Sequence, residues 1–168
     1  FRTTIHACST SWSIIVVVAL GAAVVTGGCA KPLIAPPQFF DRYPPRDVPW
    51  PLMYEKDERP RHPFTDAMRK CLCFDDEFDN AMVRRAISAY FGLTTFMDDN
   101  VGKILAALEA SGQLQNTRVI YSSDHGDNLG TRGLWGKSTM YEESAGVPMI
   151  MAGPGVPAGA ARPHQATT

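Results

Sequence analysis

The first thirty residues of the chain have almost no charged side chains. Arg2 is the only Lys or Arg before Lys31, and no Asp or Glu occurs before Asp41. The remainder of the 168-residue chain is densely charged, and the net charge is −1. Because the composition changes near residue 30, the sequence predicts an apolar N-terminal segment over residues 1–31 and a globular domain over residues 32–168.

The chain also lacks a basic excess, and this argues against a nucleic-acid partner. A zinc motif is missing as well, because Cys71 and Cys73 are the only close pair among four cysteines. We interpret the cysteines as free thiols and not as a disulfide framework. Hydrophobic residues make up 45% of the chain and charged residues 20%, which is typical of a globular protein.

The apolar N-terminal segment has four competing interpretations. Residues 12–30 carry no charge and approach Cys29 through small residues, as in a secretory or lipoprotein signal. The stretch is barely long enough for a transmembrane helix and contains three glycines. Its run of β-branched residues from Ile14 to Val18 also fits a buried strand. Finally, the segment could be foreign to the domain, as after a truncated or out-of-frame start.

These interpretations predict different locations for the protein. A signal or anchor would place it in a bacterial periplasm or on a membrane, which it would contact through residues 14–25. Without such a segment the protein would be cytoplasmic. Neither the location nor the oligomeric state follows from the sequence.

Residues 32–63 are rich in proline, with pairs at Pro36-Pro37 and Pro44-Pro45. Proline fixes φ and removes a backbone donor, so we expect an extended surface segment without helices or central strands. Five aromatic residues are expected to hold this segment against the body of the domain: Phe39, Phe40, Tyr43, Trp50 and Tyr54.

A long helical region is expected to follow. Asp79 or Asn80 can cap its start with a side-chain oxygen, and Ser111-Gly112 can end it. Apolar residues recur at the spacing of an amphipathic helix: Val101, Ile104, Leu105 and Leu108. Gly92 and the Asp98-Asp99-Asn100 cluster could divide the region into two helices.

Two strands are expected after this helical region, at residues 118–123 and 147–152. Helix, strand, loop and strand in this order indicate an α/β fold. Ligands bind at the carboxyl ends of strands in open α/β sheets. Asp124 and His125 follow the first of these strands directly, so the sequence predicts a functional loop there.

The residues of this loop carry metal and oxyanion chemistry. Asp124 offers a hard oxygen suited to calcium or magnesium, and His125 offers a nitrogen suited to zinc or to an oxyanion. Gly126 permits the sharp bend that both side chains need to face one site. Lys137 can bring a point charge to a sulfate or phosphate oxygen. A nucleotide P-loop is not expected, because Thr131 stands where that motif requires glycine.

Two runs carry a resemblance to a known family: Ser122-Ser123-Asp124-His125-Gly126-Asp127 and Leu134-Trp135-Gly136-Lys137-Ser138-Thr139. They resemble the sulfatase family of the alkaline phosphatase superfamily, especially its choline-sulfatase-like and bacterial arylsulfatase-like members. The resemblance extends over about Pro32 to Ala161. It implies an α/β fold, a fragment of the alkaline phosphatase-like sheet flanked by helices, and a parent function in sulfuric ester hydrolysis.

The resemblance also implies roles for individual residues. Asp124 would be a ligand of a divalent metal, usually calcium in this family, and His125 would complete the metal or sulfate contacts. Lys137 would contact the sulfate group of a small-molecule sulfate ester. On this basis Asp124 and His125 are the expected metal residues, and His125 and Lys137 the expected catalytic residues.

The sequence departs from the family pattern in its N-terminal part. Sulfatases carry an aspartate pair and a Cys-x-Pro-x-Arg signature whose cysteine becomes the formylglycine nucleophile, and neither occurs here. Cys8 lacks the proline and arginine of that signature, Lys31 stands where relatives have His, and Gly146 where they often have Arg. We therefore expect residues 32–168 to be a partial sulfatase catalytic domain that is inactive alone.

Two alternatives to this function stay open at the sequence level. A phosphonate or phosphodiester hydrolase of the same superfamily uses similar metal carboxylates. A non-catalytic, membrane-anchored remnant would instead use the apolar stretch at residues 14–25.

Overall fold

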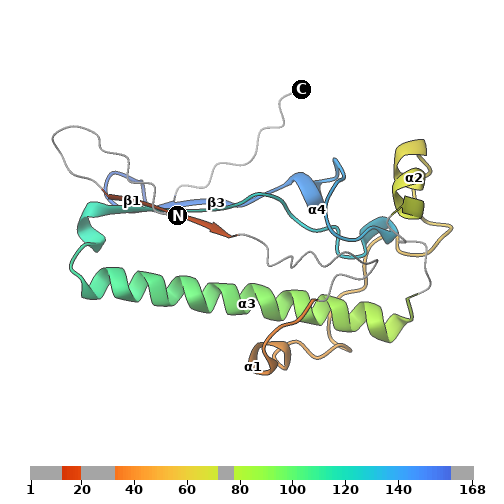
Figure 1. Ribbon diagram of the computed structural model, residues 1–168, viewed down its shortest axis with the longest axis horizontal. Helices are drawn as coiled ribbons and strands as arrows, with labels where there is room; N and C mark the ends of the chain where they lie inside the picture. Colours follow the sequence, from red (N-terminus) through yellow and green to blue (C-terminus); the bar gives the residue numbers. More distant parts are fainter. Residues whose placement is uncertain (1–12, 20–32, 72–77, 160–168) are drawn as a thin grey trace.

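The computed structural model describes residues 13–19, 33–71 and 78–159. Its elements follow one another along the chain as β1 (Ser13–Ala19), α1 (Pro37–Phe40), α2 (Pro63–Cys71), α3 (Asn80–Ala110), η1 (Leu114–Asn116), β2 (Thr117–Ser123), η2 (Thr131–Gly133), α4 (Glu142–Ala145) and β3 (Met149–Ala152). Figure 1 shows α3 running along the molecule beneath the strands, with α1 on its other side and α2 at one end. The α/β class expected from the sequence is confirmed.

The sheet has the order β1-β2-β3, with β2 in the centre. β1 pairs with β2 in parallel, from Ser13 opposite Thr117 to Ala19 opposite Ser123. β3 pairs with β2 in the antiparallel sense, with Met149 opposite Ser122. The two strands expected after the helical region are confirmed, although β2 begins one residue earlier and β3 two residues later than expected.

Residues 13–19 of the apolar N-terminal segment form a strand, as in the third of the four interpretations. Residues 1–12 and 20–32 lie outside the described part of the chain, and so do residues 20–25, half of the stretch proposed as an anchor. Among the described residues, no helix has the length and apolar character needed to cross a membrane.

α3 is one continuous helix of 31 residues. The Asp79 side chain accepts from the Met82 amide at 2.6 Å, which confirms the expected cap, and the helix ends before Ser111 and Gly112, where the Gly112 φ is +69°. The possible division at Gly92 and the Asp98-Asp99-Asn100 cluster is therefore wrong. A Cβ at Gly92 would lie 2.9 Å from the Ala35 Cβ, so this glycine permits close packing against the proline-rich segment and does not break the helix.

The proline-rich segment contains a short helix, α1, which the sequence did not lead us to expect. The carbonyl of Pro36 accepts from the amides of Phe39 and Phe40 at 2.9 and 3.0 Å. Pro37 is the first helical residue, where a missing donor costs nothing and a fixed φ suits the helix. For the same reason α2 begins at Pro63.

Aromatic contacts hold the proline-rich segment against α3, as expected. The rings of Phe39 and Phe96 lie 5.2 Å apart, and those of Tyr43 and Phe91 lie 5.5 Å apart. The buried core cluster joins the segment to the first half of α3 through Val48, Tyr54, Val83 and Ile87. The loop between β2 and β3 packs against this cluster through Leu129 and Trp135. From the end of β2 the loop runs toward α2 (Figure 1).

Candidate functional site

The chain bends sharply where β2 ends, at Asp124 and His125. The Ser123 hydroxyl donates to the His125 carbonyl at 2.8 Å, and the His125 amide donates to Asp124 Oδ1 at 3.0 Å. His125 Nδ1 lies 2.7 Å from the Gly126 carbonyl, which can only accept. Nδ1 therefore carries the proton in the neutral ring, and Nε2 presents its lone pair 3.6 Å from Asp124 Oδ2.

Gly126 is required by a close approach of two backbone segments. Its amide donates to the Ser144 carbonyl at 2.8 Å. A Cβ at this position would collide with the Glu143 carbonyl oxygen. The bend after Asp124 and His125 is thus packed directly against α4. The sequence indicated glycine here for the bend itself, whereas the structure requires it for this close packing.

Lys137 is exposed on a turn that hydrogen bonds to Asp127 and Asn128 hold in place. Asp127 Oδ1 accepts from the Leu129 and Gly136 amides, each at 2.9 Å. The buried Asn128 donates from Nδ2 to the Gly136 carbonyl at 2.7 Å and accepts from Thr139 at 3.1 Å in a second buried contact. Sequence reasoning gave these two residues no structural role, although their position between Gly126 and the Lys137 turn could have indicated one.

The structure brings Asp124 and His125 together but does not join Lys137 to them directly. Among the described residues, no hydrogen bond or ion pair links the Lys137 ammonium to either side chain. The connection is indirect, because Asp127 follows the bend and holds the amide of Gly136, the residue before Lys137. Lys137 is exposed and available to an incoming anion.

An ion pair fixes the outer side of the loop to α4. Arg132 Nη1 donates to both carboxylate oxygens of Glu143 at 2.9 Å, and its guanidinium lies 4.1 Å from the Tyr141 ring centroid. Burial raises the pKa of Glu143, but a backbone hydrogen bond and the Arg132 hydrogen bond and charge outweigh it, so the net pKa falls below 4.5. Glu143 is therefore a structural anion at neutral pH.

A tyrosine from α3 approaches the same loop from the other side. Burial raises the pKa of the half-buried Tyr90, and the negative charge of Asp127 adds to this effect, followed by Tyr121. The phenol is thus held neutral beside Asp127.

The described residues do not complete a metal site by themselves. No group of three or more His, Cys, Asp or Glu side chains in this part of the chain is arranged to hold a metal ion. Calcium takes six to eight oxygen ligands, and Asp124 supplies a single carboxylate. We therefore assign no chemical step to a metal on the basis of these residues alone.

Comparison with known proteins places the chain in a family. The model of the family described as Sulfatase matches residues 31–168. The chain belongs to the sulfatase family. This sulfatase chain is 44% identical to the choline-sulfatase of Rhizobium meliloti over 77 residues, which cover 46% of the chain and 15% of the relative. It is 35% identical to an arylsulfatase of Clostridium perfringens over 129 residues, covering 74% of the chain and 26% of the relative.

A solved structure supports the same fold. The phosphonate monoester hydrolase from Silicibacter pomeroyi superposes with a TM-score of 0.62 at 29% identity, covering 73% of this chain and 26% of that one. The chain thus spans about a quarter or less of the length of these relatives. Sulfatases generally use a metal ion and a formylglycine and act on sulfate esters, which agrees with the family that the sequence motifs resemble.

Proposed function

We propose that the chain forms one wall of a sulfate ester hydrolase active site. In this proposal Asp124 and His125 are ligands of a divalent metal, calcium, and Lys137 contacts the sulfate group. The observation that carries the proposal is the bend at the carboxyl end of β2, where Asp124 and His125 face one another. Family membership supports sulfate esters as the substrate class.

The side chains suit the charge of a sulfate ester. The Lys137 ammonium is exposed on a turn that Asp127 and Asn128 hold in place, so it can offset negative charge on the sulfate oxygens without rearrangement of the loop. The Nδ1–H of His125 is occupied by the Gly126 carbonyl, which orients Nε2 toward Asp124. The sequence contains no formylglycine signature, so the proposal assigns the nucleophile to none of these residues.

The proposal is tested with an aryl sulfate. The purified 168-residue chain is expected to bind 4-nitrophenyl sulfate in a saturable manner by isothermal titration calorimetry and to release no 4-nitrophenol. Absence of saturable binding would contradict the assignment of the sulfate contact. Hydrolysis by the chain alone would contradict the proposal that the site is only part of an active site.

A phosphonate monoester hydrolase is the second candidate function. The superposition on the enzyme from Silicibacter pomeroyi favours it. The two candidates differ in the group that Lys137 would contact, because both esters are monoanions but the sulfate has three non-bridging oxygens and the phosphonate two. Tighter binding of 4-nitrophenyl sulfate than of 4-nitrophenyl phenylphosphonate in parallel titrations supports the sulfatase, and the reverse order supports the phosphonate hydrolase.

Membrane association through residues 14–25 stays a prediction. The pairing of Ser13–Ala19 with β2 gives this segment a different role in the structure. Fractionation of cells that express the chain with and without residues 1–30 decides between a membrane anchor and a strand of the sheet. Loss of the chain from the membrane fraction on deletion supports an anchor, and an unchanged soluble fraction contradicts it.

A further inference from the structure

A cationic cavity of about 380 Å³ lies between α2 and the loop that precedes it. Its lining residues are Lys56, Arg59, Arg61, Asp66, Arg69 and Lys70. Five of these six side chains are cationic and one is acidic, so the lining has a formal charge of +4. Cavities of this volume take small-molecule ligands, and a cleft lined by charges of one sign concentrates ions of the opposite sign.

Arg69 forms the buried wall of this cavity, with 3% of its surface exposed. Its Nη1 donates to Asp66 Oδ1 and its Nη2 to the Arg132 carbonyl, both at 2.9 Å. Within the described part of the chain its Nε is buried and has no hydrogen-bond partner. A buried guanidinium with incomplete hydrogen bonding is unfavourable, so a nearby anion would stabilise this wall.

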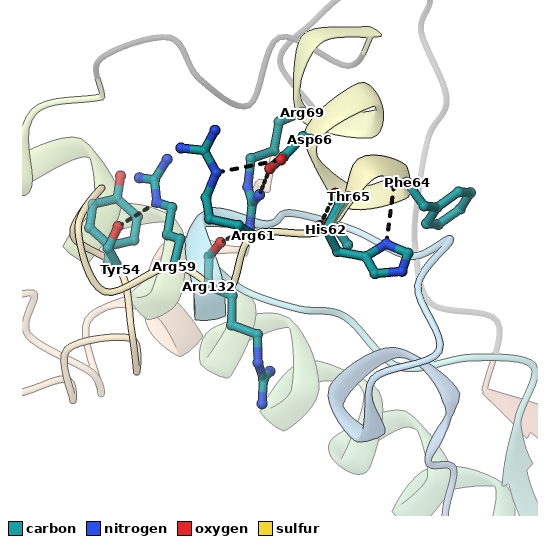
Figure 2. A network of polar contacts seen from close by, with 9 residues as sticks. All are labelled: Tyr54, Arg59, Arg61, His62, Phe64, Thr65, Asp66, Arg69 and Arg132. Atoms are coloured by element: carbon teal, nitrogen blue, oxygen red, sulfur yellow. Dashed lines mark hydrogen bonds and ion pairs between the residues drawn. The ribbon is translucent and has the colours of Figure 1, made fainter.

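Asp66 contacts two of the cations that line the pocket. Its Oδ1 binds Arg69, and its Oδ2 lies 3.5 Å from Arg61 Nε, so one carboxylate is shared by two guanidinium groups. Figure 2 shows Arg59 and Arg61 extending in the same direction beside this pair. Arg59 is fixed in that position, because its Nε donates to the Tyr54 carbonyl at 2.8 Å and its guanidinium lies 5.5 Å from the Tyr54 ring centroid.

We propose that this cavity, the Arg69 pocket, binds a sulfate group as a second oxyanion site separate from Lys137. Planar guanidinium groups donate two parallel hydrogen bonds to such oxyanions. The loop before α2 also carries three carboxylates, which are exposed and do not line the pocket: Glu55, Asp57 and Glu58. The bound group comes from free inorganic sulfate or from one sulfate of a polysulfated molecule.

The Arg69 pocket is connected to the candidate site through one residue. The carbonyl of Arg132 accepts from Arg69, while its guanidinium points away from the pocket (Figure 2) and binds Glu143. Glu143 in turn lies against Gly126, at the bend after His125. The two sites are therefore linked through Arg132 without sharing a cation, and the cations of one can be removed without altering the charge of the other.

Equilibrium dialysis of radiolabelled inorganic sulfate against the full chain tests this proposal. The Lys137→Ala variant removes the candidate site, and at constant ionic strength it is expected to retain saturable sulfate binding. Adding Arg61→Gln and Lys70→Gln should weaken that binding by about tenfold. Both positions are exposed, so the protein should fold normally, and circular dichroism verifies this.

A matched control removes two exposed cations outside the pocket, through Arg46→Gln and Lys103→Gln in the same Lys137→Ala background. This control should bind sulfate as Lys137→Ala does. The proposal is overturned if Lys137→Ala shows no saturable binding, or if the pocket and control variants lose affinity equally. Neither result bears on sulfate ester binding at Lys137, which is measured separately.

Competition distinguishes the two sources of the bound group. A disulfated disaccharide and its monosulfated counterpart are titrated against labelled sulfate in the Lys137→Ala protein. If the disulfated sugar displaces the label at a concentration about tenfold lower than unlabelled sulfate requires, the pocket is assigned to a polysulfated molecule. Equal displacement by unlabelled sulfate and by both sugars assigns it to a free sulfate group.

Discussion

Arg132 clamps Glu143 with an ion pair in which the single nitrogen Nη1 donates to both carboxylate oxygens at 2.9 Å. The pair joins the short helix η2 to α4. It is partly shielded from water, with side-chain exposures of 20% and 30%. Because the Glu143 backbone packs against Gly126, the clamp helps to hold the bend that carries Asp124 and His125.

The clamp makes stability depend on pH in the acid range. The pKa of Glu143 in the folded protein lies below its ordinary value of 4.5. Its contribution is therefore present above that value and is lost as the pH falls through the lower, folded pKa. In urea unfolding, Glu143→Gln should be less stable than the wild type by on the order of 1 kcal/mol at pH 7, and the difference should shrink below the ordinary pKa.

Glu142 is the matched control for this measurement. It precedes Glu143 in the first turn of α4 and is exposed. Glu142→Gln removes the same formal charge without breaking the contact to Arg132. Equal losses for both variants at neutral pH would show that the general charge, and not the ion pair, is responsible.

Gly126→Ala should disrupt the site without removing any functional group. The new Cβ collides with the Glu143 carbonyl, and overpacking of this kind costs about 1–3 kcal/mol. Gly102, on α3, is the opposite case, because a Cβ at this position would have no neighbouring atom within 4 Å. Gly102→Ala should therefore stabilise the helix by about 0.5–1 kcal/mol. Urea unfolding measures both, and a neutral Gly126→Ala would show that α4 is not packed against the bend.

Asp127 is predicted to position Lys137. Its Oδ1 accepts from the Leu129 and Gly136 amides, so Asp127→Ala should release the turn and weaken 4-nitrophenyl sulfate binding by about tenfold. Asp127→Asn keeps an acceptor oxygen and should retain most of the affinity. Hydrogen exchange at the Gly136 amide reports the structural step directly, and unchanged protection in Asp127→Ala would refute this role.

The sequence predicted those parts of the fold that depend on local chemistry. The Asp79 cap, the end of α3 before Ser111-Gly112 and the approximate limits of β2 follow from side chains that act on their own backbone neighbours. The position of Asp124 and His125 at the carboxyl end of β2 followed from the same strand boundary. The residues at the bend were thus accessible to sequence reasoning.

Features that depend on distant contacts were not predictable in this way. From its local sequence Gly92 is expected to break the helix, yet glycine is required there because Ala35 and Phe40 of another segment approach closely. The Arg69 pocket also depends on tertiary structure, because its cations come from both the loop and α2 and line one cavity where these two elements meet. The contact between Arg69 and the Arg132 carbonyl spans 63 positions and has no local pattern.

Asp124 is predicted to bind calcium through its carboxylate. Because the described residues hold only part of a site, the affinity of the chain should be weak, in the range of about 10⁻⁴–10⁻³ M. Asp124→Asn should abolish measurable binding in a calcium titration followed by calorimetry. Asp98→Asn on α3 is the control, since Asp98 is also exposed, and an equal effect of both substitutions would contradict a specific role for Asp124.

The most direct test of the account is the affinity of the chain for 4-nitrophenyl sulfate with and without the Lys137 ammonium. A hydrogen bond to a charged group contributes about 1.5–3 kcal/mol, so Lys137→Ala should weaken binding about tenfold or more. Lys103→Ala, which removes an exposed lysine from α3, should leave the affinity unchanged. Equal affinity of Lys137→Ala and the wild type would contradict the claim that this loop is the sulfate-binding wall of a sulfatase site.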